Sequence, residues 1–206
     1  MRPFRPPALV LVALLAVPVS SCARHEIVHG GFWFQDVTFA MAQADEARLG
    51  GPLTPKEERT IRATARAELD AAYAGRRIRF SSARGFYNVS VVQVLGGDAG
   101  RSHILVPLGG QGSIGFEPLA ALAIRYAPAG ADRAAMIVGI GRGIGRAAAH
   151  EFAHQILPEV AFDTDADRDS YEYGTADRAE EFYGPIHWDM ARPLLVKRLG
   201  PSRDGG

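Results

Sequence analysis

The stretch His150-Glu151-Phe152-Ala153-His154 constrains the fold most, because its two histidines can act together only on an α-helix. On a helix, residues four positions apart are neighbours on one face, with Cβ atoms about 5–6 Å apart. Two imidazoles so placed can bind one zinc ion at about 2.0–2.1 Å. Glu151 is then not a ligand but a base that can accept a proton from a zinc-bound water. The stretch therefore predicts a helix that carries a zinc site, and the alternative is a helix with two surface histidines.

The same pattern occurs a second time near the N-terminus, at His25-Glu26-Ile27-Val28-His29. Here Gly30-Gly31 follows at once, and Ile27 and Val28 are β-branched, so a helix is disfavoured. Without a helix the two histidines cannot share one ion. We therefore expect no catalytic role for this copy and interpret residues 22–31 as a tether.

The N-terminus itself has the pattern of an export signal. Arg2 and Arg5 precede an apolar run from Ala8 to Val19, which predicts a secretory signal peptide over residues 1–21. The sequence Val19-Ser20-Ser21-Cys22 resembles the lipobox of bacterial lipoproteins. That resemblance implies that Cys22, the chain's only cysteine, is lipidated and anchors the protein in the bacterial cell envelope. The alternative is an ordinary signal peptide with an incidental thiol.

Charge adds one exclusion. The 23 basic residues equal the 23 acidic ones, which gives no indication of a nucleic-acid partner, and we expect a monomer. The rest of the pattern predicts one α+β domain over residues 32–200. Helices are expected at 32–49, 55–74, 118–126, 133–157, 176–183 and 187–199, and strands at 78–80, 89–95, 103–108 and 111–116. Thr54 with Glu57, then Asp132 and Thr175, are the expected N-caps of the second, fourth and fifth helices, and Pro193 is expected to bend the last one.

Two glycine pairs stand four residues apart within the predicted zinc helix, Gly139 with Gly143 and Gly141 with Gly145. Each pair would let another backbone approach closely, at a cost of about 0.8–1.0 kcal/mol of helix stability per glycine relative to alanine. A break of the helix near Gly139–Gly143 is the alternative.

A catalytic zinc needs a third protein ligand. The metzincin spacing would place a histidine where Val160 stands. Downstream, Gly174-Thr175-Ala176-Asp177 and then Tyr183-Gly184 resemble the Gly-Thr-x-Asp-x-x-Tyr-Gly motif of aspzincin metallopeptidases, although the Tyr-Gly comes later here. The resemblance implies that Asp177 is the third ligand and that Tyr183 assists in the transition state. Glu172, the acidic residues of Asp163–Asp169, His187, or no third ligand remain alternatives.

The same resemblance implies a zincin-like fold, with a small twisted sheet above an active-site helix and further helices towards the C-terminus. An edge strand would pair with a peptide substrate, and 103–108 or 111–116 could provide it. For two further groups of side chains the sequence allows both a structural and a functional interpretation. The alternating Asp163, Asp165, Asp167 and Asp169 form either a solvated loop or a calcium loop, and Tyr173, Tyr183 and His187 either pack or stabilise an oxyanion.

The sequence therefore predicts a zinc-dependent metallopeptidase in which Glu151 acts as general base. Two alternatives stay open. One is an inert zincin-like envelope lipoprotein that acts as a binding module, and the other is a zinc amidase that acts on cell-wall linkages.

Overall fold

The computed structural model describes residues 26–94, 100–104, 109–158 and 168–202. Its centre is a five-stranded sheet in the order β2-β1-β3-β5-β4. Strands β2, β1, β3 and β5 run parallel, and β4 pairs antiparallel to β5 at one edge. The strands are β1 (Val28–Phe34), β2 (Ile78–Ser81), β3 (Tyr87–Val92), β4 (Gly100–Ile104) and β5 (Gly110–Gly115).

Strand β1 is the main departure from the sequence-based expectations. A helix was predicted from Phe32 to Leu49, but residues 28–34 form a strand and α1 covers only Gln43–Leu49. The predicted tether is also too long, because Val28–Gly31 pairs with β2 and β3. Gly30 does not belong to a flexible spacer. It leaves space for a core side chain, because a Cβ on Gly30 would lie 2.5 Å from the Phe80 ring.

Helix α2 (Pro55–Ala72) confirms the predicted start. The Thr54 side chain accepts from the Glu57 backbone N–H while the Glu57 carboxylate accepts from the Thr54 N–H, which completes a capping box. Arg133 then binds the same carboxylate with two nitrogens, at 2.6 and 2.9 Å. This pair ties the start of α2 to the start of the next long helix, α4.

Helix α4 (Arg133–Ile156) is capped by Asp132 and is continuous through its glycines, so no break occurs near Gly139. The predicted close approach of another backbone is confirmed for Gly141 and Gly145, whereas Gly139 and Gly143 face the side-chain rings of Tyr183 and Phe182. A Cβ on Gly141 would lie 2.9 Å from the Ile61 carbonyl oxygen of α2, and a Cβ on Gly139 would lie 2.7 Å from the Tyr183 ring. One glycine pair therefore faces α2, and the other faces the segment that contains Tyr183.

The remaining helices are α3 (Phe116–Arg125), α5 (Glu180–Tyr183) and α6 (Ala191–Leu199). The last two are shorter than predicted. Thr175 does not cap a helix, because its hydroxyl donates to Asp177 and the chain stays irregular up to Ala179. Pro193 does not bend α6, since it lies in the first turn, where proline is tolerated.

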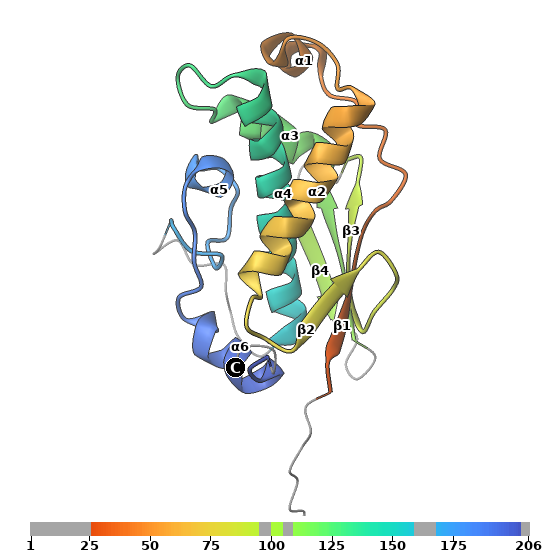
Figure 1. The fold of residues 1–206 in the computed structure, drawn as a ribbon, viewed down its shortest axis with the longest axis vertical. Coiled ribbons are helices and arrows are strands. Elements are labelled where there is room, and N and C mark those ends of the chain that lie inside the picture. The colour runs from red at the N-terminus through yellow and green to blue at the C-terminus, as the bar shows by residue number, and fades with distance from the viewer. Residues whose placement is uncertain (1–25, 95–99, 105–108, 159–167, 203–206) are drawn as a thin grey trace, which may run out of the picture.

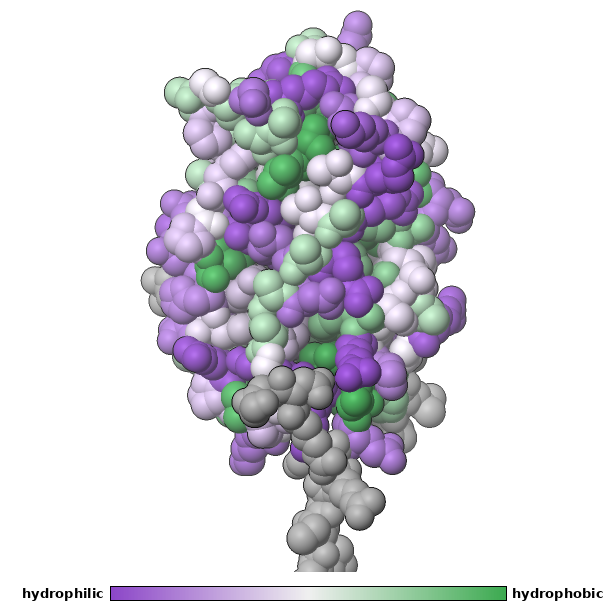
Figure 2. All heavy atoms as spheres, in the orientation of Figure 1, coloured by the Kyte–Doolittle hydropathy of each residue, from purple (hydrophilic) through white to green (hydrophobic). Residues whose placement is uncertain are grey.

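Helices α2 and α4 pack against each other on one face of the sheet, and the C-terminal segment with α5 and α6 lies on the far side of α4 (Figure 1). The described residues thus form a mixed α/β fold with six helices. The face in Figure 2 is largely hydrophilic, with hydrophobic residues in small separate groups. Within the described ranges, no helix has both the length and the apolar character needed to cross a membrane.

Candidate metal centre

The two histidines of α4 converge as their spacing predicts. The Nε2 atoms of His150 and His154 lie 2.9 Å apart, and the rings meet edge to face with centroids 4.6 Å apart. Two zinc ligands at about 2.0–2.1 Å in tetrahedral geometry have nitrogens about 3.3 Å apart. An opening of a few tenths of an ångström, on the order of a small side-chain rotation, would therefore accommodate a zinc ion. The pair fits the metal.

A backbone carbonyl sets the orientation of the first ring. Nδ1 of His150 lies 2.7 Å from the carbonyl oxygen of Tyr171. A carbonyl can only accept, so Nδ1 carries the proton, and in the neutral ring Nε2 presents its lone pair towards His154. Metal-bound histidines usually donate their second ring N–H in this way, which fixes the tautomer and the ring plane.

The segment that provides this carbonyl is held in place by a buried arginine. Arg178 is 1% exposed and donates to the carbonyl oxygens of Arg168 and Ser170 and to the Glu181 carboxylate, at 2.7 Å for the last. Tyr171 also donates its N–H to the His187 carbonyl at 2.9 Å. Neither Arg178 nor the Tyr171 carbonyl carries a sequence signal that marks it as part of the site.

Glu151 lies beside the edge strand. Its side chain is buried, at 7% exposure, and its carboxylate abuts Gly100 at the start of β4. A Cβ at Gly100 would lie 3.1 Å from the carboxyl carbon, so only glycine leaves this space. Glu151 and His154 are three residues apart and are therefore neighbours on the helix surface.

The end of α4 is locked to the sheet by Gln155, which sequence reasoning missed. The side chain is 2% exposed, and its amide accepts from the Asn88 N–H and donates to the Asn88 carbonyl, both at 3.1 Å. Gly110 provides the space, because a Cβ there would lie 2.5 Å from Gln155. Because Gln155 follows His154 directly, these two hydrogen bonds fix the position of the end of α4 relative to β3.

Glu172, one candidate for the third ligand, has a different task. It is 1% exposed, and its carboxylate accepts from the backbone N–H groups of Asp189 and Ala191 and from the Ser170 hydroxyl. These N–H groups belong to the start of α6, whose first turn has no other side-chain cap. Glu172 therefore anchors α6, and the structure does not bring it to the histidine pair.

Asp177 and Tyr183 are also not brought to the pair. The Asp177 carboxylate accepts from Thr175 at 2.5 Å on the exposed surface. Tyr183 donates to the Ala123 carbonyl at 2.7 Å and packs against Gly139, about 16 Å along the helix from His150. Burial raises the pKa of Tyr183 to about 12.

In the described part of the chain, no three His, Cys, Asp or Glu side chains come together as a metal-binding group. The remaining predicted site residues are not part of the histidine pair's surroundings as described. Residues 1–21, Cys22 and the acidic residues Asp163, Asp165 and Asp167 lie outside the described residues. Asp169 and His187 are described, and their backbones bond to each other at 2.9 Å.

Comparison of the chain with protein-family models, with curated proteins and with solved structures found no match. The chemistry of the histidine pair therefore has to be argued from its own geometry.

Proposed function

We propose that this protein is a zinc-dependent metallopeptidase, with His150 and His154 as metal ligands and Glu151 as general base. The observation that carries the proposal is the convergence of two imidazole Nε2 atoms, 2.9 Å apart, with the Nδ1 of one ring engaged by a backbone carbonyl. Without a metal ion the same contact is an N–H···N hydrogen bond between the two rings, and the carbonyl fixes which nitrogen of His150 accepts it.

Zinc bound at these nitrogens supplies polarisation of the substrate carbonyl and lowers the pKa of a bound water to about 7. The chain's own contribution is proton transfer. In this proposal Glu151 accepts the proton of the attacking water and delivers it to the leaving amine. Its burial against Gly100 holds the carboxylate in one place and limits its access to bulk water.

The edge strand supports a peptide as substrate. Among the described strands β4 pairs only with β5, so the other side of β4 can add an extended peptide by main-chain hydrogen bonds. Of the two strands expected to serve, β5 is interior, since it lies between β3 and β4. Strand β4 also begins at Gly100, beside the Glu151 carboxylate, which would put a paired peptide next to the base.

The third ligand stays a prediction. Glu172 and Asp177 have other partners, so we favour the aspartates that follow α4 and lie outside the described residues, namely Asp163, Asp165 and Asp167. A carboxylate is an accepted third ligand beside two histidines in catalytic zinc sites. Changing each of the three aspartates to asparagine and measuring zinc content would identify the ligand, and retention of zinc in all three variants would contradict this choice.

The decisive experiment compares the two copies of the motif. In the mature protein, Glu151→Gln should retain one zinc ion per chain and lose about 10²–10⁴-fold in hydrolysis of a peptide library. The matched control Glu26→Gln should retain both. Hydrolysis retained by Glu151→Gln would rule out the mechanism. Wild-type protein without stoichiometric zinc would favour the binding module, and activity on cell-wall fragments alone would favour the amidase.

Attachment to the bacterial envelope is proposed on the sequence pattern at Cys22 alone. Cys22→Ser should move the protein from the membrane fraction to the soluble fraction of cells that express it. A membrane fraction that stays unchanged would contradict lipidation at this residue.

A further inference from the structure

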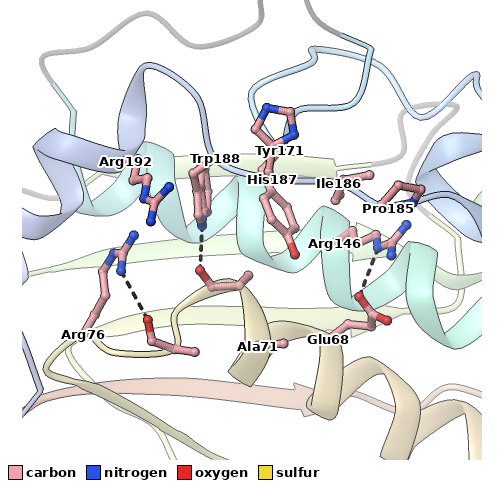
Figure 3. A pocket seen from close by; sticks show the side chains of 12 residues that line it. Glu68, Ala71, Arg76, Arg146, Tyr171, Pro185, Ile186, His187, Trp188 and Arg192 are labelled. Carbon is pink, nitrogen blue, oxygen red and sulfur yellow. Dashed lines mark hydrogen bonds and ion pairs between the residues drawn. The ribbon is translucent and has the colours of Figure 1, made fainter. Parts of the chain in front are cut away.

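A cavity of about 420 Å³ lies between the end of α2 and the C-terminal segment that precedes α6 (Figure 3). Tyr171 links it to the histidine pair, since its carbonyl bonds to His150 while its ring lines the cavity. The wall otherwise consists of small and apolar side chains, two aromatic rings and a group of charged residues.

The charges of this wall are unbalanced. Among the described residues that line it, Glu68 is the only carboxylate, and it is already shared by Arg146 at 3.1 Å and Arg142 at 3.2 Å. Through Nη1, Arg146 additionally donates to three backbone carbonyls around α5, so its Nε and Nη1 are both engaged. Two cations, Arg76 and Arg192, are left at the other end of the cavity.

These two arginines face each other without an acidic partner among the described residues (Figure 3). Arg76 makes one side-chain hydrogen bond, to the Ala74 carbonyl at 3.2 Å, and its Nε is buried without a partner. Burial and the nearby Arg192 charge both lower the pKa of Arg76. Arg192 comes from the first turn of α6 and is exposed. An anion between them would satisfy the orphan donor and remove the repulsion.

Beside the arginines the wall suits an apolar body. The Trp188 ring is held by its N–H, which donates to the Ala72 carbonyl at 2.6 Å, and it packs on Tyr171 with centroids 4.7 Å apart. Burial raises the pKa of Tyr171 to about 12, so its ring carries no charge at neutral pH. The cavity is also larger than a simple ion requires, since one water takes about 30 Å³ of the liquid.

We propose that this cavity binds a small organic anion, with its carboxylate or phosphate oxygens between Arg76 and Arg192 and its apolar part against Trp188 and Tyr171. Arginine presents a planar fork of donors that matches both groups in a bidentate manner. The proposal does not depend on zinc or on the peptidase function, because none of the anion-binding donors belongs to the histidine pair.

The experiment uses the fluorescence of Trp188 in the mature protein. Trp33→Phe leaves Trp188 as the single tryptophan, since the chain has two. Benzoate, phenyl phosphate, inorganic phosphate and the neutral benzyl alcohol are titrated separately. We expect saturable binding of benzoate or phenyl phosphate, at least about tenfold tighter than that of benzyl alcohol. The tighter of the two aromatic anions identifies the preferred acidic group.

A charge-matched pair of variants on α6 makes the test specific. Arg192→Gln should weaken binding of the tighter anion by about 10–100-fold, the effect of losing charge-assisted hydrogen bonds. Lys197→Gln removes the same charge from an exposed position outside the cavity and should change the affinity by less than about twofold. Absence of saturable binding, equal binding of benzyl alcohol, or equal loss in both variants would overturn the proposal.

Discussion

The carbonyl oxygen of Tyr171 lies 2.7 Å from Nδ1 of His150, and this contact ties a proposed zinc ligand to a segment 21 residues further along the chain. Arg178 holds that segment through the carbonyls of Arg168 and Ser170. The orientation of the first imidazole is therefore set by tertiary structure and not by α4 alone. It follows that metal affinity should respond to changes at each imidazole.

The first prediction concerns those imidazoles directly. His154→Ala should lower zinc affinity by at least about 100-fold, because one of the two convergent nitrogens is lost. His29→Ala removes an exposed histidine of the other copy, on β1, and should leave the affinity unchanged. Competition with a chromophoric chelator measures both. Equal affinity in the two variants would exclude the pair as the metal site.

The second prediction separates anchoring from metal binding at Glu172. Glu172→Gln should destabilise the protein by about 1.5–3 kcal/mol, since a charged acceptor of two backbone N–H groups is lost. Zinc content should not change. Asp177→Asn, whose carboxylate bonds only to Thr175 among the described residues, should alter neither quantity. Denaturant unfolding and metal analysis test both variants, and zinc loss at unchanged stability would make Glu172 a ligand after all.

The third prediction is a pH dependence of stability at the start of α2. The hydrogen bonds from Arg133 lower the pKa of Glu57 from 4.5 to about 2. Because the folded-state pKa is depressed, the stabilisation is complete above pH 4.5 and is lost as the pH falls towards 2. The full shift would correspond to about 3 kcal/mol, and screening at this partly exposed pair reduces it to about 1–2 kcal/mol.

Glu57→Gln should therefore be less stable than wild type at about pH 6 and nearly equal to it at about pH 2. Glu58→Gln in the same helical turn is the control, and we expect it to follow the wild-type pH profile. Denaturant unfolding at several pH values measures the difference. A gap between wild type and Glu57→Gln that does not shrink with acidification would contradict the prediction.

The parts of the fold that the sequence predicted rest on local signals. Asp132 caps α4, Thr54 and Glu57 form the capping box of α2, and the four-residue spacing brings His150 and His154 together. Each depends on residues within one or two turns of one another. Local patterning of this kind decides helix ends and helix faces before any tertiary contact forms.

The parts that the sequence did not predict depend on distant residues. Position 30 in β1 is occupied by glycine because Phe80 and Phe152 fill the space that a side chain would need. Neither phenylalanine is near Gly30 in the chain. The Tyr171 carbonyl is a backbone group, which no sequence motif marks. Glu172 resembles a free carboxylate until α6 is placed over it. Tertiary packing and backbone acceptors decided these three features.

The last prediction tests the close packing of α2 on α4. A Cβ on Gly145 would lie 2.7 Å from the Glu68 Cβ and would overlap the Ala65 carbonyl oxygen, which belongs to the backbone and cannot rotate away. Gly145→Ala gains about 0.8–1.0 kcal/mol of helix propensity, but forcing α2 outward costs about 1–3 kcal/mol or more. We therefore expect a net loss of stability, measured as a lower denaturant midpoint. A more stable variant would mean that α2 and α4 are further apart than the structure shows.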